Sequence, residues 1–159
     1  MNWASLCKNP DLANLPYKIQ TDKWGNIVMS PATNTHGIYQ AKIIALLSRL
    51  MTTGTVISEC SVQTSEGTKV ADVAWASKPF MLANKSSTPF VEAPEICVEI
   101  LSPSNTKAEM TEKKELYFAR GCQEFWLCGS DGTVQFFKNT GELAHSFIFA
   151  EFPTVVEMY

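Results

Sequence analysis

Residues 94–104 read PEICVEILSPS, an apolar run with one glutamate, Glu95, at its start and a second, Glu99, near its centre. Apolar and β-branched residues fall on both faces of the run, which predicts a buried central strand over residues 95–101. The Ser-Pro-Ser end supplies the turn that stops the strand. An ionised carboxylate among apolar neighbours is costly unless it is paired with a cation or bound to a metal. Glu99 is therefore a candidate functional residue.

A second acid, Asp72, lies in the apolar run VADVAW at residues 70–75. For either acid alone, an ion pair with a nearby lysine or arginine is the simpler explanation. Two separate strands that each hold one acid favour a shared divalent-cation site, because carboxylate oxygens are the ligands that Mg²⁺ prefers. Such an ion can polarise a phosphoryl oxygen and lower the pKa of an attacking water. The pair therefore points to phosphodiester hydrolysis.

The remaining pattern predicts an α/β fold, with a central mixed β-sheet flanked by helices and added β-hairpins. Residues 1–15 suit an N-terminal arm or short helix, and residues 78–93 a long loop. A capping box of Thr106 and Glu109 should start the second long helix. Helices are predicted over residues 34–51 and 107–120, and strands over residues 17–20, 27–29, 56–62, 69–76, 95–101, 124–128, 134–138 and 144–149.

Bulk properties narrow the class of protein. With 159 residues, the chain is expected to form a single domain over residues 1–159. Its net charge of -3 argues against a large positively charged surface that binds nucleic acid through its phosphates. The basic residues of segment 107–120 form either a local basic strip or a solvated helix face. No apolar segment has the length of a membrane span, and no signal peptide is recognisable, so a cytoplasmic protein is expected.

Three segments together resemble the Uma-type restriction endonuclease family, a bacterial family within the PD-(D/E)XK nuclease superfamily. They are VADVA at residues 70–74, PEICVEILSPS at residues 94–104 and EMTEKKELYFARG at residues 109–121. The resemblance extends over about residues 15 to 140. It implies a restriction-endonuclease-like domain that hydrolyses phosphodiester bonds in DNA with Mg²⁺ as cofactor and Mn²⁺ as the alternative.

The resemblance also implies a set of site residues. Asp72 and Glu99 would be catalytic metal ligands, Glu59 a third acidic ligand, and Lys113 the catalytic lysine. The superfamily usually keeps its lysine two residues after the second acid, where this chain has Leu101. The lysine would therefore come from the following helix.

The choice of Lys113 depends on the resemblance alone. Lys113 and Lys114 flank the apolar stripe of the helix from opposite sides, so helical periodicity does not separate them. Without the resemblance, Lys113 could equally be a solvated lysine that pairs with Glu109. The chain departs from the family pattern at Ala71, where proline is expected, and at Glu109, where aspartate is expected.

His36, next to Gly37 at the start of the first long helix, is either an accessory residue that contacts a phosphate or a residue of the helix cap without a catalytic part. Two alternatives to an active nuclease stay open. One is an inactive nuclease-like domain that binds nucleic acid or a protein partner. The other is an oligomeric scaffold that uses apolar residues 147–152, and both the resemblance and this β-rich C-terminal part suit a homodimer.

Overall fold

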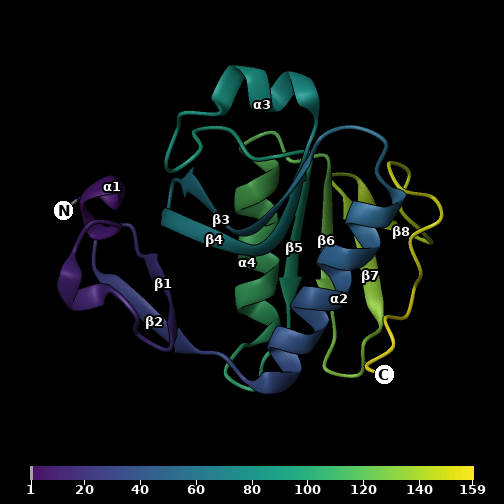
Figure 1. Cartoon of the computed structure of the whole chain (residues 1–159), viewed down its shortest axis with the longest axis horizontal. Helices are drawn as coiled ribbons and strands as arrows, with labels where there is room; N and C mark the ends of the chain where they lie inside the picture. Colours follow the sequence, from purple (N-terminus) through teal and green to yellow (C-terminus); the bar gives the residue numbers. More distant parts are fainter. Residues whose placement is uncertain (1) are drawn as a thin grey trace.

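A computed structural model describes residues 2–159 and shows a mixed α/β fold (Figure 1). The strands are β1 Tyr17–Thr21, β2 Ile27–Pro31, β3 Thr55–Thr64, β4 Gly67–Ala76, β5 Ile96–Ile100, β6 Glu124–Cys128, β7 Val134–Lys138 and β8 Gly141–Leu143. The helices are α1 Trp3–Leu6, the 3-10 helix η1 Pro10–Leu12, α2 Asn34–Leu50, α3 Lys78–Asn84 and α4 Lys107–Phe118. Within this described part, no helix has both the length and the apolar character needed to cross a membrane.

Within the described residues, six strands form the central sheet in the order β3-β4-β5-β6-β7-β8. β5 and β6 run parallel, while the other neighbouring pairs are antiparallel. A parallel pair needs a crossover connection, and α4 provides it. All five residues of β5 are buried, which confirms the predicted central strand. The expected mixed sheet with flanking helices is likewise confirmed.

α2 and α4 cover opposite faces of this sheet (Figure 1). Ile43 of α2 belongs to a buried cluster that includes Val98 of β5. Tyr117 of α4 belongs to a second cluster with Cys97 and Phe125. The adjacent residues Cys97 and Val98 therefore point to opposite faces, as the alternation of a strand requires.

The β1–β2 hairpin forms a two-stranded sheet of its own beside β4 (Figure 1). Two backbone groups of β4 donate to side chains of β1. The Val70 N–H donates to Gln20 Oε1 at 3.0 Å, and the Thr68 N–H donates to Thr21 Oγ1 at 2.8 Å. The hairpin is thus docked by side-chain hydrogen bonds onto the part of β4 that extends beyond its pairing with β5.

The segment predicted as a loop over residues 78–93 in fact begins with α3. Ser77 caps this helix, because its hydroxyl accepts from the Phe80 N–H at 3.2 Å, and Pro79 lies in the first turn. Proline is well suited to that position, where its missing N–H leaves no hydrogen bond unmade. The loop prediction was therefore wrong for residues 78–84.

The last predicted strand, over residues 144–149, is also wrong. A short strand, β8, precedes it, and residues 144–149 form bends and turns. The N–H groups of Phe147 and Ile148 donate to the buried carboxylate of Glu124 at 2.8 and 3.1 Å. A side chain rather than a neighbouring strand satisfies these donors, so the segment does not extend the sheet.

Candidate active site

Asp72 and Glu99 meet where β4 and β5 separate. The ladder between these antiparallel strands ends at the pair Val73 and Val98, and the two acids are the next residue along each strand. Beyond that pair, the Ile100 N–H donates to Asp72 Oδ2 at 2.7 Å. Each acid is only 1% exposed. The structure therefore brings the two predicted acids together in the interior.

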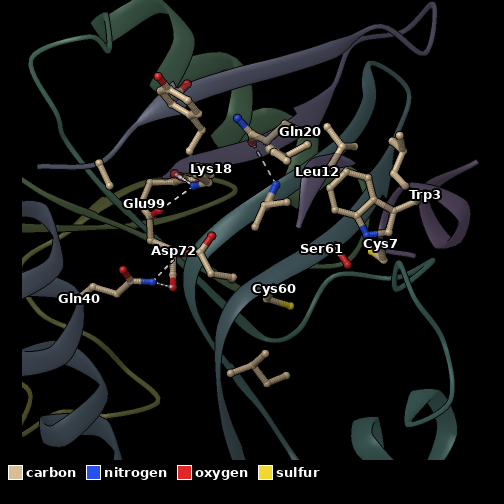
Figure 2. A pocket seen from close by; sticks show the side chains of 18 of the residues that line it. Trp3, Cys7, Leu12, Lys18, Gln20, Gln40, Cys60, Ser61, Asp72 and Glu99 are labelled. Atoms are coloured by element: carbon tan, nitrogen blue, oxygen red, sulfur yellow. Dashed lines mark hydrogen bonds and ion pairs between the residues drawn. The ribbon is translucent and has the colours of Figure 1, made fainter. Parts of the chain in front are cut away.

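The ammonium of Lys18, on β1, bridges the two acids (Figure 2). Its Nζ lies 2.6 Å from Asp72 Oδ1 and 3.4 Å from Glu99 Oε2. Burial alone would lower the pKa of Lys18, but the charges of Glu99 and Asp72 raise that pKa above its ordinary value. Burial alone would raise the pKa of the Asp72 carboxyl, but Lys18 and His36 hold it well below its usual range. Lys18 thus places a cation between the two acids.

Lys113 and Tyr117, one turn apart on α4, both reach Oε1 of Glu99. The Lys113 Nζ lies 3.1 Å from this oxygen, and the Tyr117 hydroxyl donates to it at 2.8 Å. Burial lowers the pKa of Lys113 below its ordinary value, although the charge of Glu99 acts in the opposite direction. Lys114 instead places its Nζ 4.5 Å from the ring centroid of Phe137. Lys113 is therefore the lysine of the two that faces the acids.

α2 carries His36 to the same site. Its Nε2 lies 3.2 Å from Asp72 Oδ2. This hydrogen bond is the main reason that the pKa of His36 is raised above its ordinary value of 6.5. Within residues 2–159, its Nδ1 has no hydrogen-bond partner. The helix cap is Thr33, whose hydroxyl accepts from the His36 N–H at 3.2 Å, so the imidazole is free to contact the acid.

Glu59 is connected to the site through Gln40. The Gln40 Nε2 donates to Glu59 Oε1 at 2.7 Å and to the backbone carbonyl of Asp72 at 2.8 Å. Glu59 has a φ of 52° and is exposed on β3. Across residues 2–159, no three Asp, Glu, His or Cys side chains gather in a group that could hold a metal ion. The structure therefore does not unite Glu59 with Asp72 and Glu99 in one ligand group.

The four carboxylate oxygens of Asp72 and Glu99 fall into two pairs with different partners. Asp72 Oδ2 accepts from Ile100 and His36, and Glu99 Oε1 accepts from Lys113 and Tyr117. The other two oxygens, Asp72 Oδ1 and Glu99 Oε2, share the ammonium of Lys18. Mg²⁺ is commonly held by one or two carboxylates together with water molecules. A pair of carboxylate oxygens that already shares a cation fits such an ion.

The acids lie at one end of a cavity of about 840 Å³. The N-terminal segment lines the far end, and Figure 2 shows Trp3, Cys7 and Leu12 across the cavity from Lys18 and Glu99. One wall thus comes from the N-terminal segment and the β1–β2 hairpin, and the other from the central sheet. The cavity gives the buried acids a route to solvent.

Three residues of the site were not anticipated from the sequence: Lys18, Gln40 and Tyr117. Tyr117 carried a usable signal, because it lies four residues after Lys113 and hence on the same helix face. Lys18 had no such signal in its neighbouring sequence, since its partners Asp72 and Glu99 are 54 and 81 residues away. Gln40 is likewise 32 residues from its backbone partner on β4.

Comparison with known proteins identifies the family. The model of the Uma2 family, described as putative restriction endonucleases, matches residues 23–156. A 1.96 Å crystal structure of a putative nuclease belonging to DUF820, from Anabaena variabilis, matches with a TM-score of 0.72. That match covers 98% of this chain and 94% of the other at 17% sequence identity, so it shows a shared fold. The chain matches no curated protein. The sequence resemblance is thus confirmed: the chain belongs to the Uma2 family of putative restriction endonucleases.

Proposed function

We propose that this protein is a Mg²⁺-dependent endonuclease that hydrolyses phosphodiester bonds in DNA, with Mn²⁺ as an alternative cofactor. Membership of the family supports nuclease chemistry. The nuclease-like fold supports it as well, although fold by itself does not set an activity. We infer DNA as the substrate from the family, and Mg²⁺ as the cofactor from the chemistry of the acidic pair.

One observation carries the proposal: Asp72, Glu99 and Lys113 converge from β4, β5 and α4. Leu101 occupies the position where the nuclease superfamily usually has its lysine. Lys113 supplies an amine next to the second acid from a different element. Two acids that could hold a divalent ion, with one lysine beside them, suit metal-assisted phosphodiester hydrolysis.

Asp72 and Glu99 would hold the divalent ion, which when bound would supply polarisation of the phosphodiester and a lower pKa for the attacking water. Lys113 would orient that water and stabilise the negative charge that develops as the water attacks. Tyr117 and His36 would keep the two carboxylates in place by binding their other oxygens. The substrate phosphate would reach the acids through the cavity.

The homodimer expected from the C-terminal residues stays a prediction. Within segment 147–152, Phe147 is 66% exposed, whereas Phe152 is 2% exposed and belongs to the core. A dimer that uses this segment would therefore depend on Phe147 at its centre.

The test is cleavage of supercoiled and single-stranded DNA by pure protein in Mg²⁺ or Mn²⁺. Asp72→Asn and Lys113→Met should each reduce the cleavage rate by about 100-fold or more, the size of effect expected for a group in the reacting site. Lys114→Met is the matched control, because Lys114 is adjacent in sequence but faces Phe137. It should cut at the parent rate. Circular dichroism should show that all variants are folded.

Two results would overturn the proposal. Absence of cleavage by the parent on both substrates would favour an inactive nuclease-like domain. Cleavage by Asp72→Asn and Lys113→Met at the parent rate would mean that the activity lies elsewhere.

A further inference from the structure

We propose that the Lys18 ammonium occupies the metal site while no divalent ion is bound. When a divalent ion binds, the ammonium leaves the two carboxylates. The inference rests on the proposed function, since it concerns the same oxygens of Asp72 and Glu99. It assigns to the β1–β2 hairpin, which lies outside the central sheet, a direct part in controlling metal entry.

The first argument is the division of the carboxylate oxygens. Asp72 Oδ2 is bound by Ile100 and His36, and Glu99 Oε1 by groups of α4. The oxygens left for an incoming ion are Asp72 Oδ1 and Glu99 Oε2. Lys18 Nζ lies 2.6 Å and 3.4 Å from these two atoms. A divalent ion and the Lys18 ammonium therefore need the same two oxygens.

The second argument is charge. Asp72 and Glu99 can contribute two negative charges, and the ammonium groups of Lys18 and Lys113 both contact them. A divalent ion added beside both ammonium groups would leave the buried site with an excess of positive charge, and like charges repel strongly away from bulk water. Departure of one ammonium reduces that excess.

Of the two lysines that contact the acids, Lys18 is the one whose side chain can move away from them. Lys113 projects from α4, a helix packed on the sheet, and it contacts Oε1, the oxygen that Tyr117 also binds. Lys18 projects from a hairpin whose contacts with β4 include side-chain hydrogen bonds of Gln20 and Thr21. Its side chain is 13% exposed and lines the cavity, so the ammonium has a path to solvent through a rotamer change.

The test measures metal binding by the protein without DNA. Mn²⁺ affinity is determined by electron paramagnetic resonance for the parent, Lys18→Met and Lys69→Met. Lys69 also joins β4 to the hairpin, through a 3.3 Å hydrogen bond to the Thr21 carbonyl, but it does not line the cavity of the acids. Lys18→Met should bind Mn²⁺ about tenfold more tightly or better, because a competing ion pair has been removed. Lys69→Met should bind like the parent.

A second measurement does not depend on the stability of a variant. In the parent with ¹⁵N-labelled lysine, the Lys18 Nζ resonance is followed as Mg²⁺ is added. It should move toward the position of a solvated ammonium, while that of Lys69 should stay. If Lys18→Met does not fold, this titration decides the question, with Lys18→Gln as the replacement variant.

The inference fails if Lys18→Met binds Mn²⁺ as tightly as the parent or more weakly. It also fails if the Lys18 Nζ resonance does not shift when Mg²⁺ is added to saturation. That failure is distinct from failure of the proposed function. A parent that binds Mn²⁺ and cuts DNA, together with an unchanged Lys18→Met, overturns the role of Lys18 alone. A parent that binds no divalent ion overturns both.

Discussion

The Tyr117 hydroxyl donates a 2.8 Å hydrogen bond to the Glu99 carboxylate. Both residues are almost completely buried, so no water replaces this bond when it is lost. The bond fixes one oxygen of Glu99 and leaves the other directed at Lys18. In the proposed active site, Tyr117 would therefore position the acid rather than touch substrate.

Replacement of Tyr117 by phenylalanine removes the bond and keeps the ring. We expect the free energy of unfolding to fall by about 1.5–3 kcal/mol, the range for a hydrogen bond to a charged group. DNA cleavage should fall by about 10- to 100-fold, as for other residues that orient a metal ligand. Urea unfolding and a cleavage assay measure the two effects. Tyr159→Phe, at a fully exposed position, is the control and should change neither.

The contact between His36 and Asp72 makes stability depend on pH. Because the pKa of His36 is raised above 6.5 in the folded protein, its stabilising effect is complete below pH 6.5. The effect is lost as pH rises through the raised pKa. With a chelator present, the parent should therefore exceed His36→Gln in stability by more at pH 5.5 than at pH 9. Urea unfolding across this range measures the difference.

His145→Gln is the control for this pH profile, because His145 is exposed and its Nδ1 lies near the Ser146 carbonyl rather than an acid. Its stability should follow that of the parent at each pH. A difference between the parent and His36→Gln that stays constant with pH would contradict the assigned ion pair.

The acidic pair could be predicted from sequence because each acid interrupts a short apolar strand, a pattern with a stated energetic cost. The start of α4 could be predicted as well, since Thr106 and Glu109 form the expected capping box. The choice between Lys113 and Lys114 could not, because both flank the apolar stripe of the helix. It needed the rotation of α4 about its axis, which packing against the sheet sets.

Lys18 could not be predicted for a different reason. Nothing near Lys18 in sequence differs from an ordinary exposed strand, and its position depends on how the hairpin docks on β4. Side chains of β1, rather than a continued ladder, contribute that docking. A lysine that pairs with acids across such a distance in sequence becomes visible only in the folded chain.

Glu124 is a third acid within an apolar strand, and its role is structural. Its carboxylate accepts from the Trp126 indole at 2.8 Å, the Ser146 hydroxyl at 2.7 Å and the N–H groups of Phe147 and Ile148. Glu124→Gln replaces one acceptor oxygen by an amide that donates, so two donors would face each other. We expect a loss of about 3 kcal/mol in unfolding free energy, because a buried network is left unsatisfied.

Glu142→Gln is the matched control, since Glu142 is exposed and accepts one long bond from Gln135 at 3.3 Å. It should change stability by less than about 0.5 kcal/mol. Limited proteolysis adds a local measure: Glu124→Gln should be cut faster within residues 144–150. If both variants are as stable as the parent, Glu124 does not hold the C-terminal segment in place.

Gly67 determines how closely the β1–β2 hairpin approaches β4. Its φ is +90°, and a Cβ added there would lie 2.3 Å from the Asp22 carbonyl oxygen. Gly67→Ala should therefore cost about 3 kcal/mol, from the left-handed backbone together with the forced shift of the hairpin. Gly25→Ala is the control: its φ is +84°, but its Cβ would meet no atom within 4 Å, so only the backbone cost of about 1 kcal/mol applies. Hydrogen exchange of the β1 amides should accelerate in Gly67→Ala beyond the change seen in Gly25→Ala. Equal exchange in the two variants would mean that close contact at Gly67 does not hold the hairpin, and with it Lys18, against the acids.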